Sequence, residues 1–327
     1  MEAVLAVDVG ATWLRVGLVD ISSLKLIKLT KVPTPQTHYS DAIPEALRSA
    51  LMSTIAGVRL HRAAGVASIG PLDSTAGEIL KAPNVVGRPS RVDVASPLIE
   101  LGLVEEVYLI NDCNAAALAE WWARRTEGVE DLLYVTISTG IGAGCVLSSR
   151  PLLGRRGNAM ELGHVVVDPS GYLPCGCGGK GHWEAYGSGG NVLAFARRLL
   201  EDGHIPKSTQ LWAYVDSGGR DPSEVFRLYR AADPGAAAFC ERLASIQAAG
   251  LASAVNVLDP EVLVLGGSVY LGNRDFFVND VFPMMERYLM LESPVMEDPV
   301  FGEHSPIVGA AIACSMELEG ARVLKRK

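Results

Sequence analysis

The sequence has no apolar run long enough to cross a membrane and no large cluster of basic residues. Its longest apolar runs, such as Val262–Leu265, have the length of a strand, whereas a membrane helix needs about 20 apolar residues. No Lys/Arg cluster exceeds the short Arg155-Arg156 and the terminal Lys325-Arg326-Lys327, and the net charge is -8. We therefore expect neither a membrane nor a nucleic acid as a main partner.

A targeting segment and a disulfide framework are also missing. Met1-Glu2-Ala3 leads directly into a predicted strand without a basic flank, so we expect no leader. Cys113, Cys145, Cys240 and Cys314 each stand alone in the sequence, far from any other cysteine, which is typical of reduced core thiols. Both features predict a cytoplasmic protein.

The two common nucleotide-binding motifs are absent as well. The chain contains no G-x-x-x-x-G-K-[ST] sequence, which is the signature of a P-loop. The segment Gly176–Gly181 matches G-x-G-x-x-G, but it lies inside a cysteine-containing loop with no strand before it and no clear helix after it. A dinucleotide-binding unit needs both, so we reject that interpretation.

What the sequence does contain is a repeated strand, turn and strand. Residues 132–147, LLYVTISTGIGAGCVL, can be aligned by pattern with residues 4–19, VLAVDVGATWLRVGLV, as an internal duplication would leave them. The 327 residues suffice for two domains. Alternating strands and helices with a repeated half predict an α/β protein with two sheets and a cleft between them, where strand ends of both halves meet.

Apolar periodicity and capping residues place the individual elements. The expected strands are 3–10, 11–20, 24–32, 63–69, 107–110, the two strands within 132–147, and 262–265. The expected helices are about 39–57, 114–124, 191–202, 223–232, 234–258, 275–289 and 305–319. Asp233 followed by Pro234 is a typical helix start. We expect a small domain at 1–112, joined by the C-terminal helix at about 305–327, and a large domain at 113–304.

The two small-residue turns are candidate phosphate sites. In Asp8–Thr12, Gly10 lets the backbone approach an anion, the Thr12 hydroxyl can donate to it, and Asp8 can reach Mg²⁺ through water. In Ser138–Gly144, alternate glycines expose N–H groups and Thr139 adds a hydroxyl. Each turn alone could equally be an ordinary hairpin. The repetition of the pattern favours a function.

Asn111-Asp112 follows an apolar strand and precedes a helix. A carboxylate there could accept the proton of a substrate hydroxyl as that hydroxyl attacks a phosphoryl group. The alternative is that Asp112 simply caps the helix.

The segment Glu161–Glu184 combines two histidines, two cysteines and many glycines with few residues that could form a core. His164, Cys175, Cys177 and His182 supply the four nitrogen and sulfur donors of a closed structural zinc site. A Cys175–Cys177 disulfide is the alternative, but so short a ring is strained and would leave both histidines unexplained.

These motifs together resemble the ROK family of sugar kinases, in its glucokinase and hexokinase branch. The motifs that carry the resemblance occur in the family's order: Asp8-x-Gly10-x-Thr12-x-x-Arg15, Ala82-Pro83-Asn84, Asn111-Asp112, Thr139-Gly140-x-Gly142-x-Gly144, Glu161-x-Gly163-His164, Cys175-Gly-Cys177-Gly-x-x-Gly181 and Gly266-Gly267. The resemblance implies an actin-like fold of two domains, of the hexokinase and ribonuclease H type. It also implies ATP, Mg²⁺ and a hexose bound in the interdomain cleft, and structural Zn²⁺.

The resemblance also assigns roles residue by residue. Asp112 would be the base for the sugar 6-hydroxyl. The other hydroxyls would be bound by Asn84, Asn111, Glu161, His164 and Glu184. The phosphates and metal would be held by Asp8, Gly10, Thr12, Thr139 and Gly140, and the adenosine would be flanked by Gly266 and Gly267. Family members usually have a third cysteine where this chain has His182, so we expect a Cys₂His₂ site.

Glucose is the expected substrate. Fructose, mannose or an N-acyl hexosamine are alternatives, since cleft shape sets the choice of sugar. A non-catalytic sugar-sensing regulator is a further alternative, and the presence of Asp112 and both phosphate turns speaks against it. The resemblance also implies a homo-oligomer, either a dimer or a tetramer.

Overall fold

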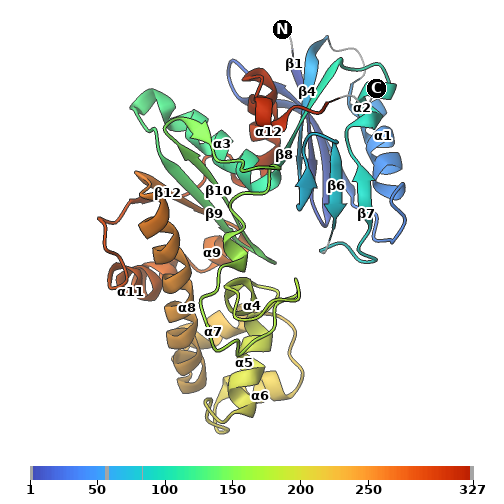
Figure 1. Ribbon diagram of the computed structural model, residues 1–327. Coiled ribbons are helices and arrows are strands. Elements are labelled where there is room, and N and C mark those ends of the chain that lie inside the picture. Colours follow the sequence, from blue (N-terminus) through green and yellow to red (C-terminus); the bar gives the residue numbers. More distant parts are fainter. Residues whose placement is uncertain (1–2, 56–58, 83, 325–327) are drawn as a thin grey trace. The chain divides into compact units, whose positions relative to one another are not determined.

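The computed structural model describes residues 3–55, 59–82 and 84–324 (Figure 1). The chain forms two compact units. The first comprises Met1–Tyr134, Gly144–Met160 and Pro299–Lys327, and the second comprises Val135–Ala143 and Glu161–Asp298.

The first unit is built on a five-stranded sheet of order β3-β2-β1-β4-β8. Its strands are β1 Ala3–Val9, β2 Trp13–Asp20, β3 Lys25–Pro33, β4 Leu60–Ser68 and β8 Glu106–Asn111. Strands β1, β2 and β3 pair antiparallel, whereas β1 with β4 and β4 with β8 pair parallel. The strands expected in this region are confirmed.

Helices cover both faces of this sheet. Helix α1 (Ala42–Thr54) buries Ile43 and Leu47 in one apolar cluster with Val16 of β2. On the other face, a Cβ at Gly17 would lie 2.9 Å from Ile307 of α12 (Ser305–Ser315). Because both faces are covered, β1 is buried along its whole length.

Helix α12 packs between β4 and helix α3 (Asp112–Arg124), and small residues make the close approach possible. A Cβ at Gly309 would lie 1.7 Å from the Ala115 carbonyl oxygen, and one at Gly65 would lie 1.8 Å from the Ala310 carbonyl oxygen. Helix α3 therefore belongs to the first unit. The domain limits expected from the sequence, at 112 and 304, differ from the limits of the compact units for this reason.

The buried carboxylate of Glu120 connects α3 with the start of α12 through hydrogen bonds. Glu120 is fully buried and accepts hydrogen bonds from Arg124 (2.8 Å), from the backbone N–H groups of Val300 (2.8 Å) and Phe301 (3.2 Å), and from the Ser305 hydroxyl (2.8 Å). Removing the carboxylate would therefore break several hydrogen bonds at once.

We predict that Glu120→Ala lowers the free energy of unfolding by about 3–5 kcal/mol, because it removes a buried carboxylate that pairs with Arg124 and accepts from two backbone N–H groups. Urea unfolding of the variant measures the effect. Glu100→Ala is the matched control, since Glu100 pairs with Arg48 at the surface and exposed pairs contribute about 1 kcal/mol or less. Equal losses in the two variants would contradict the prediction.

The first unit also carries a small antiparallel sheet and a short helix. The strands are β5 Leu72–Asp73, β6 Glu78–Lys81 and β7 Ser90–Asp93, and the helix is α2 Ser96–Glu100. Asn84 lies in the loop between β6 and β7 and is exposed. Its neighbour Pro83 lies outside the described residues.

The second sheet has the order β11-β10-β9-β12-β13. Its strands are β9 Leu132–Ile137, β10 Ile141–Leu147, β11 Arg150–Pro151, β12 Val262–Gly266 and β13 Val295–Glu297. The limits of the two compact units fall within β9 and β10. Neighbouring β9 and β10 confirm the predicted repeat of the opening hairpin.

The helices of the second unit follow the metal-binding segment. They are α4 Glu184–Gly187, α5 Val192–Glu201, α6 Gln210–Asp216, α7 Ser223–Arg230, α8 Pro234–Leu258, α9 Ser268–Gly272, α10 Arg274–Phe276 and α11 Phe282–Glu286. Helix α8 begins as predicted, because the Asp233 side chain accepts a hydrogen bond from the backbone N–H of Ala236. Helix α6 is absent from the sequence prediction.

The single helix expected at about 275–289 is wrong in form. Helix α10 runs into a π-helical segment, Phe277–Val281, before α11 begins. Pro283 lies in the first turn of α11. Proline has no N–H and its ring clashes with the carbonyl four residues back, so a regular α-helix cannot continue through this point.

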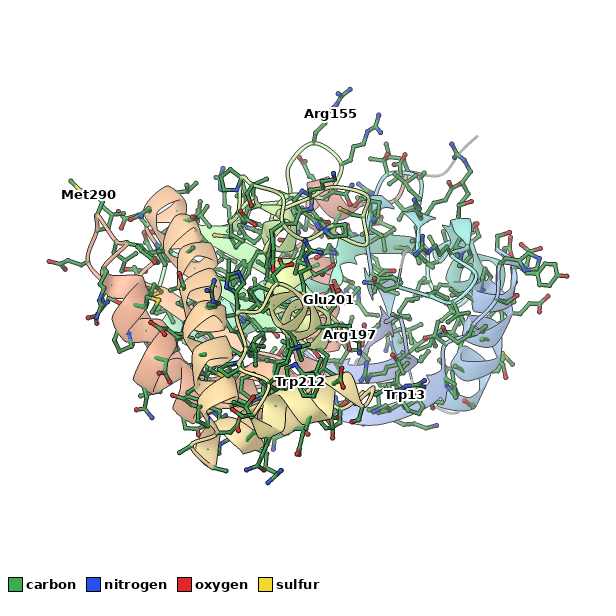
Figure 2. All side chains as sticks on the ribbon, turned by 90° about the horizontal axis from the view of Figure 1, so that it is seen from below. Trp13, Arg155, Arg197, Glu201, Trp212 and Met290 are labelled. Carbon is green, nitrogen blue, oxygen red and sulfur yellow. The ribbon has the colours of Figure 1, made fainter. Side chains whose placement is uncertain are left out.

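Exposed side chains lie on both units, including Trp13, which is 39% exposed, and Met290, which is 89% exposed (Figure 2). The helices within the described ranges are all too short or too polar to cross a lipid bilayer.

Candidate active site and metal cluster

The first turn connects β1 with β2 tightly. The backbone N–H of Gly10 donates to the carbonyl oxygen of Trp13 at 3.0 Å. A Cβ at Gly10 would lie 2.9 Å from that same oxygen, so a larger residue would force the turn to shift. Thr12 is exposed within the turn. The turn therefore has the compact backbone that a phosphate site needs.

Asp8 is buried at the end of β1, with 3% of its surface exposed. It accepts a hydrogen bond from Arg15 Nη1 at 2.7 Å. Burial raises the pKa of Asp8 to about 6, although the Arg15 charge opposes the shift. Burial of this carboxylate therefore lowers the stability of the folded protein. Residues with strongly shifted pKa values are often found at functional sites.

The sequence did not predict that Glu303 and Lys31 join Asp8 and Arg15 in one cluster of charged side chains. Glu303 accepts from Arg15 Nη2 at 2.9 Å and from Lys31 Nζ at 3.3 Å. The bond from Arg15 is the main cause that lowers the pKa of Glu303. Glu303 lies 288 residues from Arg15 in sequence, so no local pattern could reveal the contact.

We predict that Asp8→Asn stabilises the folded protein at alkaline pH. The pKa of Asp8 is about 6 in the folded protein, above its ordinary value of 3.8. The wild type therefore loses stability as the pH rises from 3.8 to above about 6. The variant lacks this loss and should gain up to about 3 kcal/mol at pH 8. Urea unfolding at pH 4 and pH 8 tests this, because the difference should vanish at pH 4. An equal difference at both pH values would contradict it.

Asn111 and Asp112 lie at the same edge of the first sheet as the first turn. Val9 of β1 pairs with Ser68 of β4, and Ser68 pairs with Asn111 of β8. The carboxyl ends of these parallel strands therefore form one row, at a spacing of about 5 Å per strand. This is where open α/β sheets place their ligands.

The structure corrects the capping alternative for Asp112. Asn111 is the N-cap of α3, and its Oδ1 accepts from the backbone N–H groups of Cys113 (2.9 Å) and Asn114 (3.2 Å). Asp112 is the first residue of the helix, half-buried, and its Oδ1 also accepts from Cys113 N–H at 2.8 Å. A negative charge is favoured at this helix end, and capping does not require Asp112.

The second turn lies between β9 and β10, and the backbone N–H of Ser138 donates to the carbonyl oxygen of Gly140 at 2.9 Å. Gly144 packs closely against α3. A Cβ there would lie 2.2 Å from the Cys113 carbonyl oxygen, so a larger residue at this position would push against the α3 backbone.

Gly266 and Gly267 lie beside the second turn. A Cβ at Gly267 would lie 2.4 Å from the carbonyl oxygen of Ile137, and Gly267 has a positive φ of 88°. The hydroxyls of Ser138 and Ser268 lie 3.1 Å apart. The start of α9 and the second turn are therefore in contact, as one nucleotide site would require.

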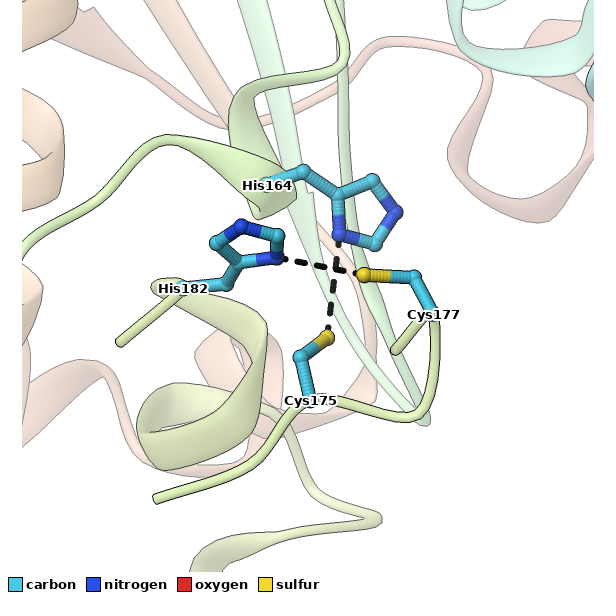
Figure 3. Close-up of side chains that lie close together, drawn as sticks. All are labelled: His164, Cys175, Cys177 and His182. Carbon is cyan, nitrogen blue, oxygen red and sulfur yellow. Dashed lines mark hydrogen bonds between the residues drawn. The ribbon is translucent and has the colours of Figure 1, made fainter. Parts of the chain in front are cut away.

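The four predicted metal ligands lie together (Figure 3). The donor atoms of His164, Cys175, Cys177 and His182 all lie within 4.8 Å of one another. His182 Nδ1 lies 3.2 Å from Cys177 Sγ, and His164 Nδ1 lies 3.8 Å from Cys175 Sγ. Both cysteines are free, so the disulfide alternative is wrong. Two thiols and two imidazoles at these distances fit one tetrahedral Zn²⁺.

Backbone hydrogen bonds shape the loop that carries these ligands. The Cys175 N–H donates to the Gly179 carbonyl at 2.8 Å, and the Gly178 N–H donates to the Cys175 carbonyl at 2.9 Å. Gly178 has a positive φ of 99°, which only glycine adopts readily. The segment Gly176–Gly181, which matches G-x-G-x-x-G, therefore forms part of the metal-binding loop. Its position agrees with the rejection of the dinucleotide interpretation.

Glu161 and Glu184 flank the metal ligands in sequence. Glu161 Oε2 lies 3.9 Å from Nε2 of His164, and both side chains are partly exposed, by 49% and 34%. Because Nδ1 of His164 faces the cysteine, Nε2 is the nitrogen left for a second partner. Glu184 Oε2 accepts from the backbone N–H of Ile141 at 2.9 Å. Glu161 therefore lies beside a metal ligand, whereas Glu184 contacts the second turn.

The chain matches known proteins along almost its whole length. A model of the ROK family covers residues 4–316. A glucokinase from Aeropyrum pernix is 36% identical over 322 residues, which are 95% of this chain and 96% of that protein.

Two crystal structures are also similar. A ROK hexokinase from Thermus thermophilus matches with a TM-score of 0.78 and 34% identity, over 97% of this chain and 99% of that chain. A ROK family glucokinase from Streptomyces griseus, in complex with glucose and AMPPNP, matches with a TM-score of 0.75 and 27% identity, over 96% of this chain and 100% of that chain. The predicted α/β fold of the actin-like type is confirmed, and the chain belongs to the ROK family.

Proposed function

We propose that this ROK-family sugar kinase transfers the γ-phosphoryl group of ATP to the 6-hydroxyl of glucose. The observation that carries the proposal is Asp112, which follows β8 at the sheet edge where the first phosphate turn also lies. The similar glucokinase that was crystallised with glucose and AMPPNP supports both the sugar and the type of phosphoryl donor.

In this mechanism Asp112 accepts the proton of the sugar 6-hydroxyl as its oxygen attacks the γ-phosphorus. Phosphoryl transfer demands mainly positioning and charge stabilisation. Gly10, Thr12, Thr139 and Gly140 would bind phosphate oxygens through N–H and O–H groups, and Asp8 would hold a water of Mg²⁺. Mg²⁺ neutralises charge on the transferring phosphoryl group when bound.

The remaining site residues would bind the two substrates. The sugar hydroxyls would be bound by Asn84, Asn111, Glu161, His164 and Glu184. The adenosine would lie against Gly266 and Gly267, whose lack of side chains leaves room for a flat ring. His164 would contribute through Nε2, since its Nδ1 points to the metal cluster.

The metal cluster would hold one Zn²⁺ per chain through His164, Cys175, Cys177 and His182. Zinc closed by four protein ligands has a structural role and no open position for chemistry. The four donors fit this ion, and His182 takes the place of the third cysteine that relatives usually have. By resemblance, we also propose that the protein is a homo-oligomer.

A coupled assay of ATP consumption, run against a panel of sugars and phosphoryl donors, tests the proposal. We expect turnover with glucose and ATP that depends on Mg²⁺. Faster turnover with fructose, mannose or an N-acyl hexosamine would overturn the sugar assignment. No sugar-dependent turnover, together with tight sugar binding by calorimetry, would instead identify a sensor.

A further inference from the structure

Both ends of the metal-binding loop contact one residue of the second turn, Ile141. At the first end, next to His164, a Cβ on Gly163 would lie 2.2 Å from the Ile141 carbonyl oxygen. At the other end, Glu184 Oε2 accepts from the Ile141 N–H at 2.9 Å. The carbonyl and the amide of a single turn residue are therefore in contact with the two ends of the loop.

The residues after α4 continue along the same turn. Gly189 N–H donates to the Ser138 carbonyl oxygen at 2.7 Å, and Gly190 N–H donates to the Thr139 carbonyl oxygen at 3.0 Å. A Cβ on Gly140 would lie 2.6 Å from Glu184 Oε2. A side chain at position 140 would therefore have to displace the Glu184 carboxylate.

Glu184 itself is rigidly placed. It follows the metal ligand His182 by two residues, and the intervening Trp183 is fully buried. The Trp183 indole N–H donates to Gln247 Oε1 of α8 at 2.7 Å, and Gln247 Nε2 donates to the Gly187 carbonyl at 2.9 Å. The metal cluster on one side and α8 on the other therefore determine where the carboxylate lies.

We propose that Glu184 is a positioning residue for the second phosphate turn, in addition to its proposed contact with the sugar. Hydrogen bonds to a charged acceptor are roughly twice as strong as neutral ones, so the carboxylate can hold the Ile141 amide in place. Oε2 accepts from Ile141, and the other carboxylate oxygen, Oε1, would contact a sugar hydroxyl. Glu184 thus couples the metal cluster and the sugar contact to the nucleotide site. This inference rests on the proposed function, because that proposal makes the turn a nucleotide site.

Two substitutions separate positioning from sugar contact. Glu184→Ala removes the acceptor, whereas Glu184→Gln keeps an amide oxygen that can accept the Ile141 N–H. We expect Glu184→Ala to raise the KM for ATP by about tenfold or more, the loss expected for a hydrogen bond to a charged group. We expect Glu184→Gln to recover most of that loss, while both variants raise the KM for glucose.

Amide hydrogen exchange of the metal-loaded protein without substrates provides a readout independent of activity. The amides of residues 139–142 should exchange faster in Glu184→Ala than in the wild type and nearly normally in Glu184→Gln. Glu201→Ala is the matched control, since Glu201 lies exposed on α5 and should change neither exchange nor KM. Zinc content and thermal unfolding confirm that each variant is folded.

Unchanged exchange at 139–142 in Glu184→Ala would overturn the proposal, whatever the kinetics show. Faster exchange with an unaltered KM for ATP would also overturn it, because the turn would then not serve the nucleotide. Failure of the proposed function would give a different result, because the wild type would then show no sugar-dependent ATP turnover. Amide hydrogen exchange would still show whether Glu184 positions the turn.

Discussion

Asp112→Asn should lower kcat for hexose phosphorylation by at least about a hundredfold, the usual scale of general-base effects. Asparagine cannot accept the proton of the 6-hydroxyl, but it is nearly isosteric and can still hydrogen-bond the sugar. The KM for glucose should therefore change little, and the loss should appear in kcat. Steady-state kinetics with a coupled assay measure both constants.

The structure also predicts that this variant folds normally. Asn111, not Asp112, caps α3, so the first turn of the helix keeps its side-chain acceptor. Asp93→Asn is the matched control, because Asp93 Oδ1 accepts from backbone N–H groups at the start of α2 and has no proposed catalytic role. A variant of Asp112 that kept more than about a hundredth of the wild-type rate would exclude it as the base.

Removal of the metal should have the second large effect. We expect about one zinc per chain by elemental analysis, and His182→Ala should lose most of it. The loop from Glu161 to Glu184 has few residues that can pack into a core, so a bound ion would supply much of its folding free energy. Structural zinc in small domains is worth about 10 kcal/mol or more.

Loss of zinc should therefore make the loop sensitive to protease and abolish activity, since it carries Glu161, His164 and Glu184. Limited proteolysis with and without a chelator measures the first effect. His182→Cys is the matched control, because cysteine is an equivalent ligand and should retain the metal. A metal-free protein that stays folded and fully active would refute the structural role.

Local patterns predicted those features that depend on neighbours in sequence. The hairpin of β1 and β2 follows from apolar runs separated by the Gly10 turn, and the start of α8 follows from Asp233 and Pro234. The metal ligands could also be identified from the sequence, since Cys175, Cys177 and His182 lie within a few residues of one another. Short-range geometry leaves such segments little choice.

Features that depend on packing were missed or misassigned. The close packing of Gly144 against Cys113 could not be predicted from the glycine series. The helix expected at 275–289 gives way to a π-helical segment before Pro283. Glu303 completes the charge cluster of Asp8 from the far end of the chain. A one-dimensional pattern carries no information on such partners.

The order of residues along the chain specifies which chemical groups are present: a carboxylate after β8, two glycine-containing turns, four metal donors and the motifs of the ROK family. The partners of these groups are set by folding. In the folded structure Asn111, and not Asp112, is the N-cap of α3. Glu184 accepts a hydrogen bond from the backbone amide of Ile141. The physical reason is that hydrogen-bond partners are selected by the approach of distant backbone segments, and that approach is set by packing the whole unit.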